Sequence, residues 1–284
     1  MDRAQNILMA KKHIVENIYS SVKIEGLGMT FPETSVILEN GKLEGKTFDE
    51  VSFVNDLKHA WNYLFDHIDD QIDLELVKAF NRISGKYTVN NAGSIRSIFD
   101  EPVGIRGSRD DIVWTPDIPP RSSVINDEII KKNSIPDRVD AAVELYIYLA
   151  KGQFFNDGNK RVASLVCNMT LIQSGEGLFI VPVEENLTFK ELLINYYITD
   201  DPLRIKSFIK DKCIVKPSLK TTGQKIQILR ERAGISREEM AQIIGVSSER
   251  MYEMERDKNI SEDVIRALSE YFEIEKEELI IDTI

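Results

Sequence analysis

The chain has 284 residues, of which 42% are hydrophobic and 29% charged, and its formal net charge is −11. This length suits one large domain together with a small one, and this composition excludes a disordered polymer. The acidic balance argues against a protein whose whole surface grips nucleic acid, although it is compatible with a local basic patch.

Several features place the chain in the cytoplasm. No run of eighteen apolar residues occurs, which excludes a membrane-spanning helix. The first residues are polar and lead into a charged amphipathic pattern, unlike a signal peptide. Cys167 and Cys213 lack a metal-binding spacing and fit a reducing compartment. We therefore expect a cytoplasmic protein without a membrane partner.

The pattern predicts a mainly α-helical protein. Apolar residues recur near the helical period over about 4–26, where Gly26 ends the first helix. Glycine and proline are frequent in 92–120, and the pattern there predicts a β-hairpin with strands at 103–106 and 111–115. Further helices are expected at 51–65, 74–83, 139–150, 162–172, 187–197 and 203–209.

Residues 213–222 separate two domains in this interpretation. They lack periodicity and contain Pro217, so we expect a linker. The predicted domains are therefore 1–212 and 223–284.

The segment 153–161, Gln-Phe-Phe-Asn-Asp-Gly-Asn-Lys-Arg, lies between two apolar helices. A turn that feeds directly into a helix exposes unpaired backbone N–H groups, and the helix dipole adds partial positive charge. Lys160 and Arg161 place two cations at this end, where they are unfavourable to the helix itself. An anionic ligand is therefore expected there, and the alternative is a surface turn with local hydrogen bonds.

The spacing of this segment resembles the signature of the Fic family, which runs His, any, Phe, any, Asp or Glu, Gly, Asn, Gly or Lys, Arg. The resemblance implies that the chain binds ATP with Mg²⁺ and transfers AMP to a hydroxyl group of a target protein. It covers roughly residues 5–210. The matching residues, in order, are Phe155, Asp157, Gly158, Asn159, Lys160 and Arg161.

The same resemblance implies a role for each matching residue. Asp157, a suitable hard-oxygen ligand for Mg²⁺, would hold the ion between the α- and β-phosphates. Gly158 and Asn159 would line an anion hole beside Lys160, and Arg161 would bind the γ-phosphate.

Position 153 departs from the signature. The family's leading histidine is the general base for the target hydroxyl, and here the residue is Gln153. An amide cannot accept that proton at neutral pH. Losing a general base typically removes about 10²–10⁴-fold of rate. Phosphate binding is compatible with this change, whereas rapid transfer is not.

A second family element is present near the N-terminus, in residues 21–26. Ser21 and Glu25 are spaced i, i+4 and share one helix face. In the resembling group this helix lies against the active site and inhibits it. Applied here, Glu25 would pair with Arg161 by a bidentate bond and keep ATP from seating productively. A helix end with a solvated glutamate is the alternative interpretation.

Residues 223–284 resemble a helix-turn-helix domain of the lambda-repressor (XRE) type. Ser236 and Glu239 form a capping box, and residues 245–247 form a tight turn before the next helix. On that helix Arg250, Tyr252 and Arg256 are the candidate DNA-binding residues.

The charge of this segment opposes DNA binding. Residues 221–284 contain nine Lys and Arg against fifteen Asp and Glu, a formal charge of −6. Acidic side chains on the recognition helix repel phosphates. Two interpretations stay open, a dimeric module that reads a DNA operator and a protein-interaction module that has kept the fold.

The function has three alternatives at this level. The first is a protein adenylyltransferase that is slow or conditional because Gln153 replaces the base. The second is a catalytically inactive, nucleotide-sensing pseudoenzyme that regulates transcription through the helix-turn-helix. The third is an autoregulating DNA-binding protein whose first domain is the sensor. A hydrolytic variant, in which Glu25 positions water to remove AMP from a target, would lack an acid at position 153.

Overall fold

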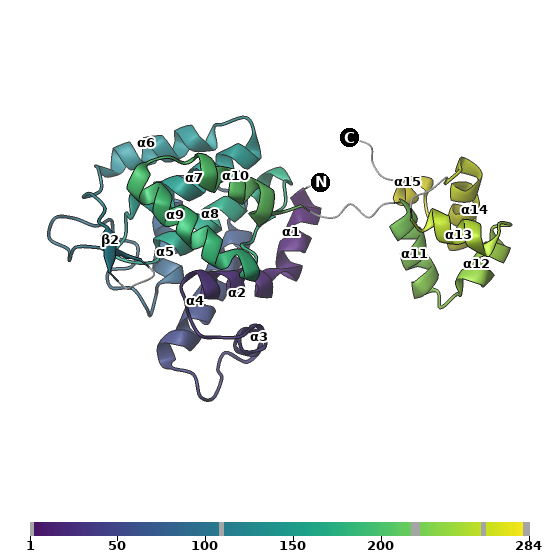
Figure 1. Cartoon of the computed structure of the whole chain (residues 1–284), viewed down its shortest axis with the longest axis horizontal. Helices are drawn as coiled ribbons and strands as arrows, with labels where there is room; N and C mark the ends of the chain where they lie inside the picture. The colour runs from purple at the N-terminus through teal and green to yellow at the C-terminus, as the bar shows by residue number, and fades with distance from the viewer. Residues whose placement is uncertain (1–2, 108–110, 217–221, 257–259, 281–284) are drawn as a thin grey trace. The chain divides into compact units, whose positions relative to one another are not determined.

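The computed structural model describes residues 3–107, 111–216, 222–256 and 260–280. The chain divides into two compact units, Met1–Pro217 and Ser218–Ile284, and both are mainly helical (Figure 1). No described helix combines the length and the apolar character that a membrane-spanning segment needs.

The first unit is a helical assembly with two small antiparallel sheets. Its helices are α1 (Arg3–Lys12), α2 (Ile14–Ile24), α3 (Phe31–Asn40), α4 (Phe48–Asp66), α5 (Leu74–Ser84), α6 (Ser122–Asn133), α7 (Arg138–Gly152), α8 (Asn159–Ser174), α9 (Asn186–Thr199) and α10 (Leu203–Phe208), with a 3₁₀ turn at Val183–Glu185 and a π-helical turn at Ile209–Cys213. Its strands are β1 (Ile105–Arg106), β2 (Ile112–Trp114), β3 (Leu178–Phe179) and β4 (Ile214–Val215).

Helix α8 is the centre of this unit. Most of its residues are buried, as expected for a helix that is covered on all sides. Helices α1, α4, α5 and α7 contact it, and α7 makes the most extensive contact. The loop that joins α7 to α8 is therefore held at the ends of two central helices.

Two asparagines and a serine fix the outer segments to this centre. Asn168 of α8 donates to the carbonyl of Phe179 and accepts from its N–H, at 3.1 and 2.9 Å. Asn6 of α1 makes the same pair of bonds with Gly177. Ser20 of α2 exchanges two 3.1 Å bonds with Val181. These buried bonds fix α1 and α2 against the core.

The N-terminal helix differs from the prediction. Residues 4–26 form two helices, because His13 leaves the helical conformation with φ −99° and ψ 20°. Helices α3 and α6 were not predicted. Helix α3 begins with a capping box in which Thr30 and Glu33 bond reciprocally.

The predicted linker is shorter in the structure. Cys213 is buried, and Ile214–Val215 pairs with Leu178–Phe179 as strand β4. The first unit therefore extends beyond the predicted boundary at 212, to Pro217. The rest of the predicted linker, 217–221, lies outside the described residues.

The second unit consists of α11 (Thr222–Arg232), α12 (Arg237–Ile243), α13 (Ser248–Met254), α14 (Glu262–Phe272) and α15 (Lys276–Leu279). The predicted capping box at Ser236 and Glu239 is present and begins α12. Its core contains Ile226, Met240, Ala241, Met251, Met254, Val264, Leu268 and Leu279.

Candidate functional site

The loop 153–158 is held by side chains of α8 and α5. Asn159 accepts a hydrogen bond from the N–H of Phe155 at 3.0 Å and donates to its carbonyl at 2.8 Å. Asn81 of α5 donates to the carbonyl of Asp157 at 2.9 Å. The ring of Phe155 is buried. The loop is therefore fixed before any ligand arrives.

Gly158 is the residue that turns the chain into α8. Its φ is +80°, in the left-handed region that favours glycine. A Cβ atom there would lie 3.0 Å from the amide nitrogen of Asn81. Both the backbone conformation and the space thus call for glycine at this position.

Gln153 is buried at the start of the loop, and both the nitrogen and the oxygen of its side-chain amide form hydrogen bonds with protein groups. Its Nε2 donates to the carbonyl of Ala150 at 2.7 Å, and its Oε1 accepts from Asn159 at 3.1 Å. The backbone is left-handed, with φ 43°. The side chain is oriented but, as an amide, cannot remove a proton from a hydroxyl group.

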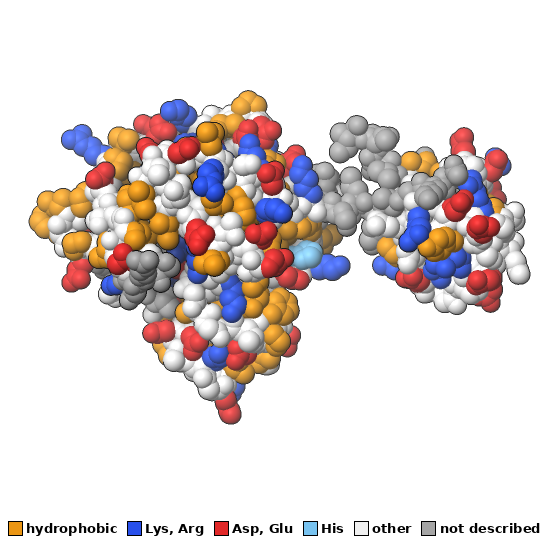
Figure 2. All heavy atoms as spheres, viewed as in Figure 1, with side chains coloured by type: hydrophobic (Ala, Val, Ile, Leu, Met, Phe, Trp, Pro, Cys, Tyr) orange, Lys and Arg blue, Asp and Glu red, His pale blue; other side chains and the backbone are white. Residues whose placement is uncertain are grey.

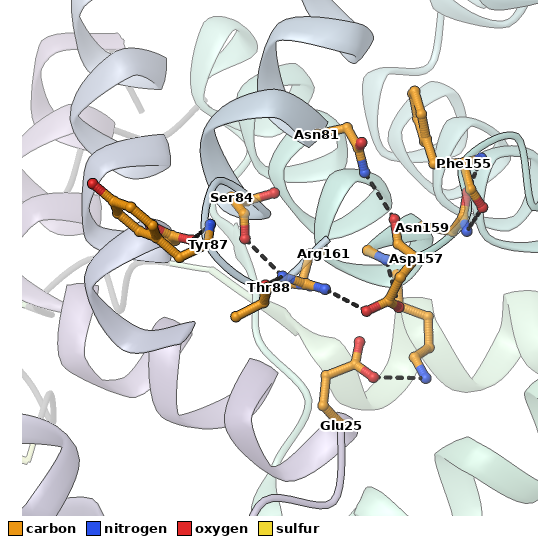
Figure 3. A network of polar contacts seen from close by, with 12 residues as sticks. Glu25, Asn81, Ser84, Tyr87, Thr88, Phe155, Asp157, Asn159 and Arg161 are labelled. Carbon is orange, nitrogen blue, oxygen red and sulfur yellow. Dashed lines mark hydrogen bonds and ion pairs between the residues drawn. The ribbon is translucent and has the colours of Figure 1, made fainter. Parts of the chain in front are cut away.

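Arg161 points away from α2, toward α5 (Figure 3). Its guanidinium donates to the carbonyl of Ser84 at 2.7 Å and to the hydroxyl of Thr88 at 3.1 Å. It also pairs with Asp157 at 2.9 Å. Its side chain is only 3% exposed, and its Nε has no acceptor in the described part of the chain. Arg161 therefore binds protein groups in this conformation.

Glu25 pairs with Lys160 and not with Arg161, which corrects the prediction. Its carboxylate lies 3.1 Å from the Lys160 ammonium, and the dashed line that starts at Glu25 in Figure 3 marks an ion pair of this carboxylate. Consecutive residues at the start of a helix point about 100° apart, so Lys160 faces α2 while Arg161 faces α5. Burial raises the pKa of Glu25, but the attraction of Lys160, Arg161 and Lys190 outweighs it and leaves the pKa below its ordinary value.

Two contacts position Glu25 at the end of α2. Ser20 bonds to Val181, as described above, and Asn186 of α9 donates to the carbonyl of Lys23 at 2.8 Å. Ser21, the other residue of the predicted inhibitory element, donates to the carbonyl of Asn17 within its own helix at 3.2 Å. The Ser21 hydroxyl therefore bonds within α2 and not to a residue of the site.

Two cavities flank Glu25 and Asp157, which line both. The first has a volume of about 420 Å³ and is also lined by Gln153, Asn159 and Lys160. The second, of about 330 Å³, lies on the side of Arg161. The predicted inhibitory glutamate thus lies together with most of the predicted loop residues at these two cavities.

Residues of α9 and of the hairpin complete the first cavity. Lys190 and Tyr197 come from α9, and Ile105 and Arg106 come from β1. The hairpin was predicted, and its strands pair antiparallel, although residues 108–110 of its turn lie outside the described residues. No sequence pattern distinguishes Lys190 or Tyr197 from ordinary residues of an amphipathic helix, and both were missed.

The metal-binding prediction rests on Asp157 alone. Among the described residues, no group of three or more His, Cys, Asp or Glu side chains is arranged to hold a metal ion. The side chain of Asp157 is 62% exposed beside the cavity. A single exposed carboxylate fits Mg²⁺, because this ion is usually bound by one or two carboxylates together with substrate phosphates and water.

In the second unit, the predicted DNA-binding residues Arg250 and Tyr252 lie on α13, and Arg256 follows it. Tyr252 is 43% exposed, and the guanidinium carbons of Arg237 and Arg256 lie 5.2 and 4.6 Å from the centroid of its ring. Arg250 pairs with Glu253 at 3.2 Å. On the face of this unit seen in Figure 2, basic and acidic side chains are interspersed.

Glu255 follows α13 and is a structural residue. Its side chain is 4% exposed and bonds to Arg230 of α11 at 2.5 Å and to Arg237 of α12 at 2.9 Å. One buried carboxylate thus joins three helices of the unit.

Comparison with known proteins identifies both folds. Residues 223–279 match the family model of the helix-turn-helix domain. No curated protein matches the chain. Among solved structures, a fragment of the Fic-1 protein of C. elegans is similar over 71% of this chain and 59% of its own, with 21% identity and a TM-score of 0.55. This chain therefore spans less than two thirds of that fragment.

Two bacterial structures give the same result. A Fic domain containing signaling protein from Bacteroides thetaiotaomicron is 17% identical over 72% of this chain and 82% of its own, with a TM-score of 0.58. A Fic family protein from Desulfovibrio desulfuricans is 14% identical over 80% and 75%, with a TM-score of 0.55. The likeness at these identities is one of fold, and the first unit has the fold of Fic-domain proteins.

Proposed function

We propose that the first unit binds ATP with Mg²⁺ at the loop 153–161, and that Glu25 restrains this binding. The observation that carries the proposal is the pairing of Glu25 with Lys160 at 3.1 Å beside a 420 Å³ cavity. The carboxylate occupies the place of an external anion at the start of α8. A phosphate group and Glu25 would compete for the same ammonium group.

The roles of the residues follow from their positions. Asp157 would hold Mg²⁺, which would neutralise phosphate charge when bound. The N-terminus of α8, with Gly158 and Asn159, would receive a phosphate oxygen. Gln153 orients its amide toward Asn159 and removes no proton, so AMP transfer to a hydroxyl group would be slow. Nucleotide binding is accordingly the main activity in this proposal, and protein adenylylation a secondary one.

Replacing Glu25 by glutamine should increase the affinity for Mg·ATP roughly tenfold or more, because a charged hydrogen bond that opposes the ligand is lost. Calorimetric titration of the full-length protein measures this. Glu191→Gln is a matched control, since Glu191 lies on α9 but does not line the 420 Å³ cavity. Equal affinities for the wild type and Glu25→Gln would contradict the restraining role of Glu25.

A second function is favoured by the helix-turn-helix match at 223–279. In this alternative the chain is a nucleotide-sensing transcriptional regulator that binds an operator as a dimer. Arg250, Tyr252 and Arg256 would contact DNA. Because the predicted contacts include only two arginines in each protomer, electrostatic attraction would contribute little to the affinity.

The expected result is modest binding to a palindromic site upstream of the protein's own gene, with a shallow salt dependence. Four phosphate contacts in a dimer predict a slope of log affinity against log salt of roughly −4 or shallower. Fluorescence anisotropy with upstream DNA measures the slope, and Arg250→Ala should weaken binding. If no duplex binds even at low salt, the second unit is a protein-interaction module.

A further inference from the structure

Two lysines from different helices face the 420 Å³ cavity. Lys160 lies in the first turn of α8, and Lys190 lies in α9. Lys160 pairs with Glu25, whereas Lys190 forms no ion pair with a described side chain. A Cβ atom on Gly26 would lie 3.9 Å from the Lys190 ammonium. This ammonium group therefore lies beside the turn that carries Glu25.

Glu25 attracts both ammonium groups, although its ion pair is with Lys160. Burial lowers the pKa of Lys190, repulsion from Lys160 lowers it further, and Glu25 partly offsets both. The other carboxylate at the cavity, Asp157, is already paired with Arg161. Arg106 also lines the cavity, so its cations outnumber its carboxylates in a protein whose net charge is −11.

Arg161 is poorly placed to bind an anion in this cavity. Two of its nitrogens donate to protein acceptors and its side chain is 3% exposed. Lys160 and Lys190 are more exposed and line the cavity itself. A lysine ammonium is a compact charge with three donors, which suits contact with phosphate oxygens.

We infer that Lys190 is a phosphate-binding residue, and that Lys160 and Lys190 form a two-lysine clamp for the polyphosphate of the ligand. Glu25 occupies the clamp when no ligand is bound. This inference rests on the proposed function and adds a residue of α9 that the loop motif does not contain. Lys190 also lines a 700 Å³ groove between α9 and the hairpin, so it borders both hollows.

The test is calorimetric titration of the full-length protein with inorganic tripolyphosphate and, separately, with ATP. The affinities for both ligands are compared between Glu25→Gln, which removes the carboxylate that pairs with Lys160, and the double variant Glu25→Gln with Lys190→Met. The second substitution should weaken both ligands roughly tenfold, the effect expected for one charged hydrogen bond. Lys190→Arg should retain most of the affinity because it keeps the charge.

Lys12→Met is the control, because Lys12 is exposed at the end of α1 and lines neither cavity. If Lys190→Met binds both ligands as Lys12→Met does, the inference is wrong and the proposed function stands. If only ATP is weakened, Lys190 contacts the nucleoside and the clamp is wrong. If Glu25→Gln binds neither ligand, the proposed function falls together with the clamp.

Discussion

Replacing Gln153 by histidine in a Glu25→Gln background should raise the rate of AMP transfer by roughly 10²–10⁴-fold, the usual contribution of a general base. The present amide donates to the carbonyl of Ala150 at 2.7 Å. The Nδ1–H of an imidazole would make that bond and leave Nε2 unprotonated toward the cavity. The Asn159 amide would lose the oxygen of Gln153 as an acceptor but would keep the carbonyl of Phe155.

Incubation with α-labelled ATP and cell lysate measures the transfer. Gln153→Asn in the same background is the matched control, because asparagine tolerates the left-handed backbone of this position but accepts no proton. Labelling by the histidine variant alone would assign the loss of transfer to position 153. Equal labelling in both variants would contradict that assignment, whereas no labelling in either variant would favour a protein that only binds nucleotide.

The loop was predictable because its characteristic residues follow one another in the sequence. Residues 153–161 carry the glycine, the asparagine and the cations in one stretch between apolar helices, and the structure places that stretch between α7 and α8. The direction of each side chain was not predictable. The sequence prediction paired Glu25 with Arg161, yet helical geometry turns Lys160 toward Glu25 and Arg161 toward Ser84.

Residues that join the site from a distance were also missed. Lys190 belongs to α9, and only the packing of that helix beside α2 brings its ammonium to Glu25. The break at His13 was hidden because apolar residues continue at helical spacing on both sides of it. The start of α3, by contrast, had a usable signal in the capping box of Thr30 and Glu33.

Replacing Glu255 by alanine should unfold the second unit while the first remains folded. The carboxylate is the shared partner of Arg230 and Arg237, and the Arg230 side chain is itself only 11% exposed. Removing one partner of a buried ion pair typically costs about 3–5 kcal/mol, because a buried charge is left uncompensated. A loss of that size is comparable with the whole stability of a domain of this length, about 3–5 kcal/mol.

Hydrogen exchange of the full-length protein, followed by mass spectrometry, separates the two units. Peptides from 223–279 should lose protection in Glu255→Ala, and peptides from α7 and α8 should keep it. Glu253→Ala is the matched control, because Glu253 is 41% exposed and its pair with Arg250 is a surface contact worth at most about 1 kcal/mol. If both variants keep native protection, the bonds of Glu255 do not stabilise the unit. Loss of protection in Glu255→Ala alone would make this carboxylate the residue that holds α13 in place for any contact by Arg250, Tyr252 and Arg256.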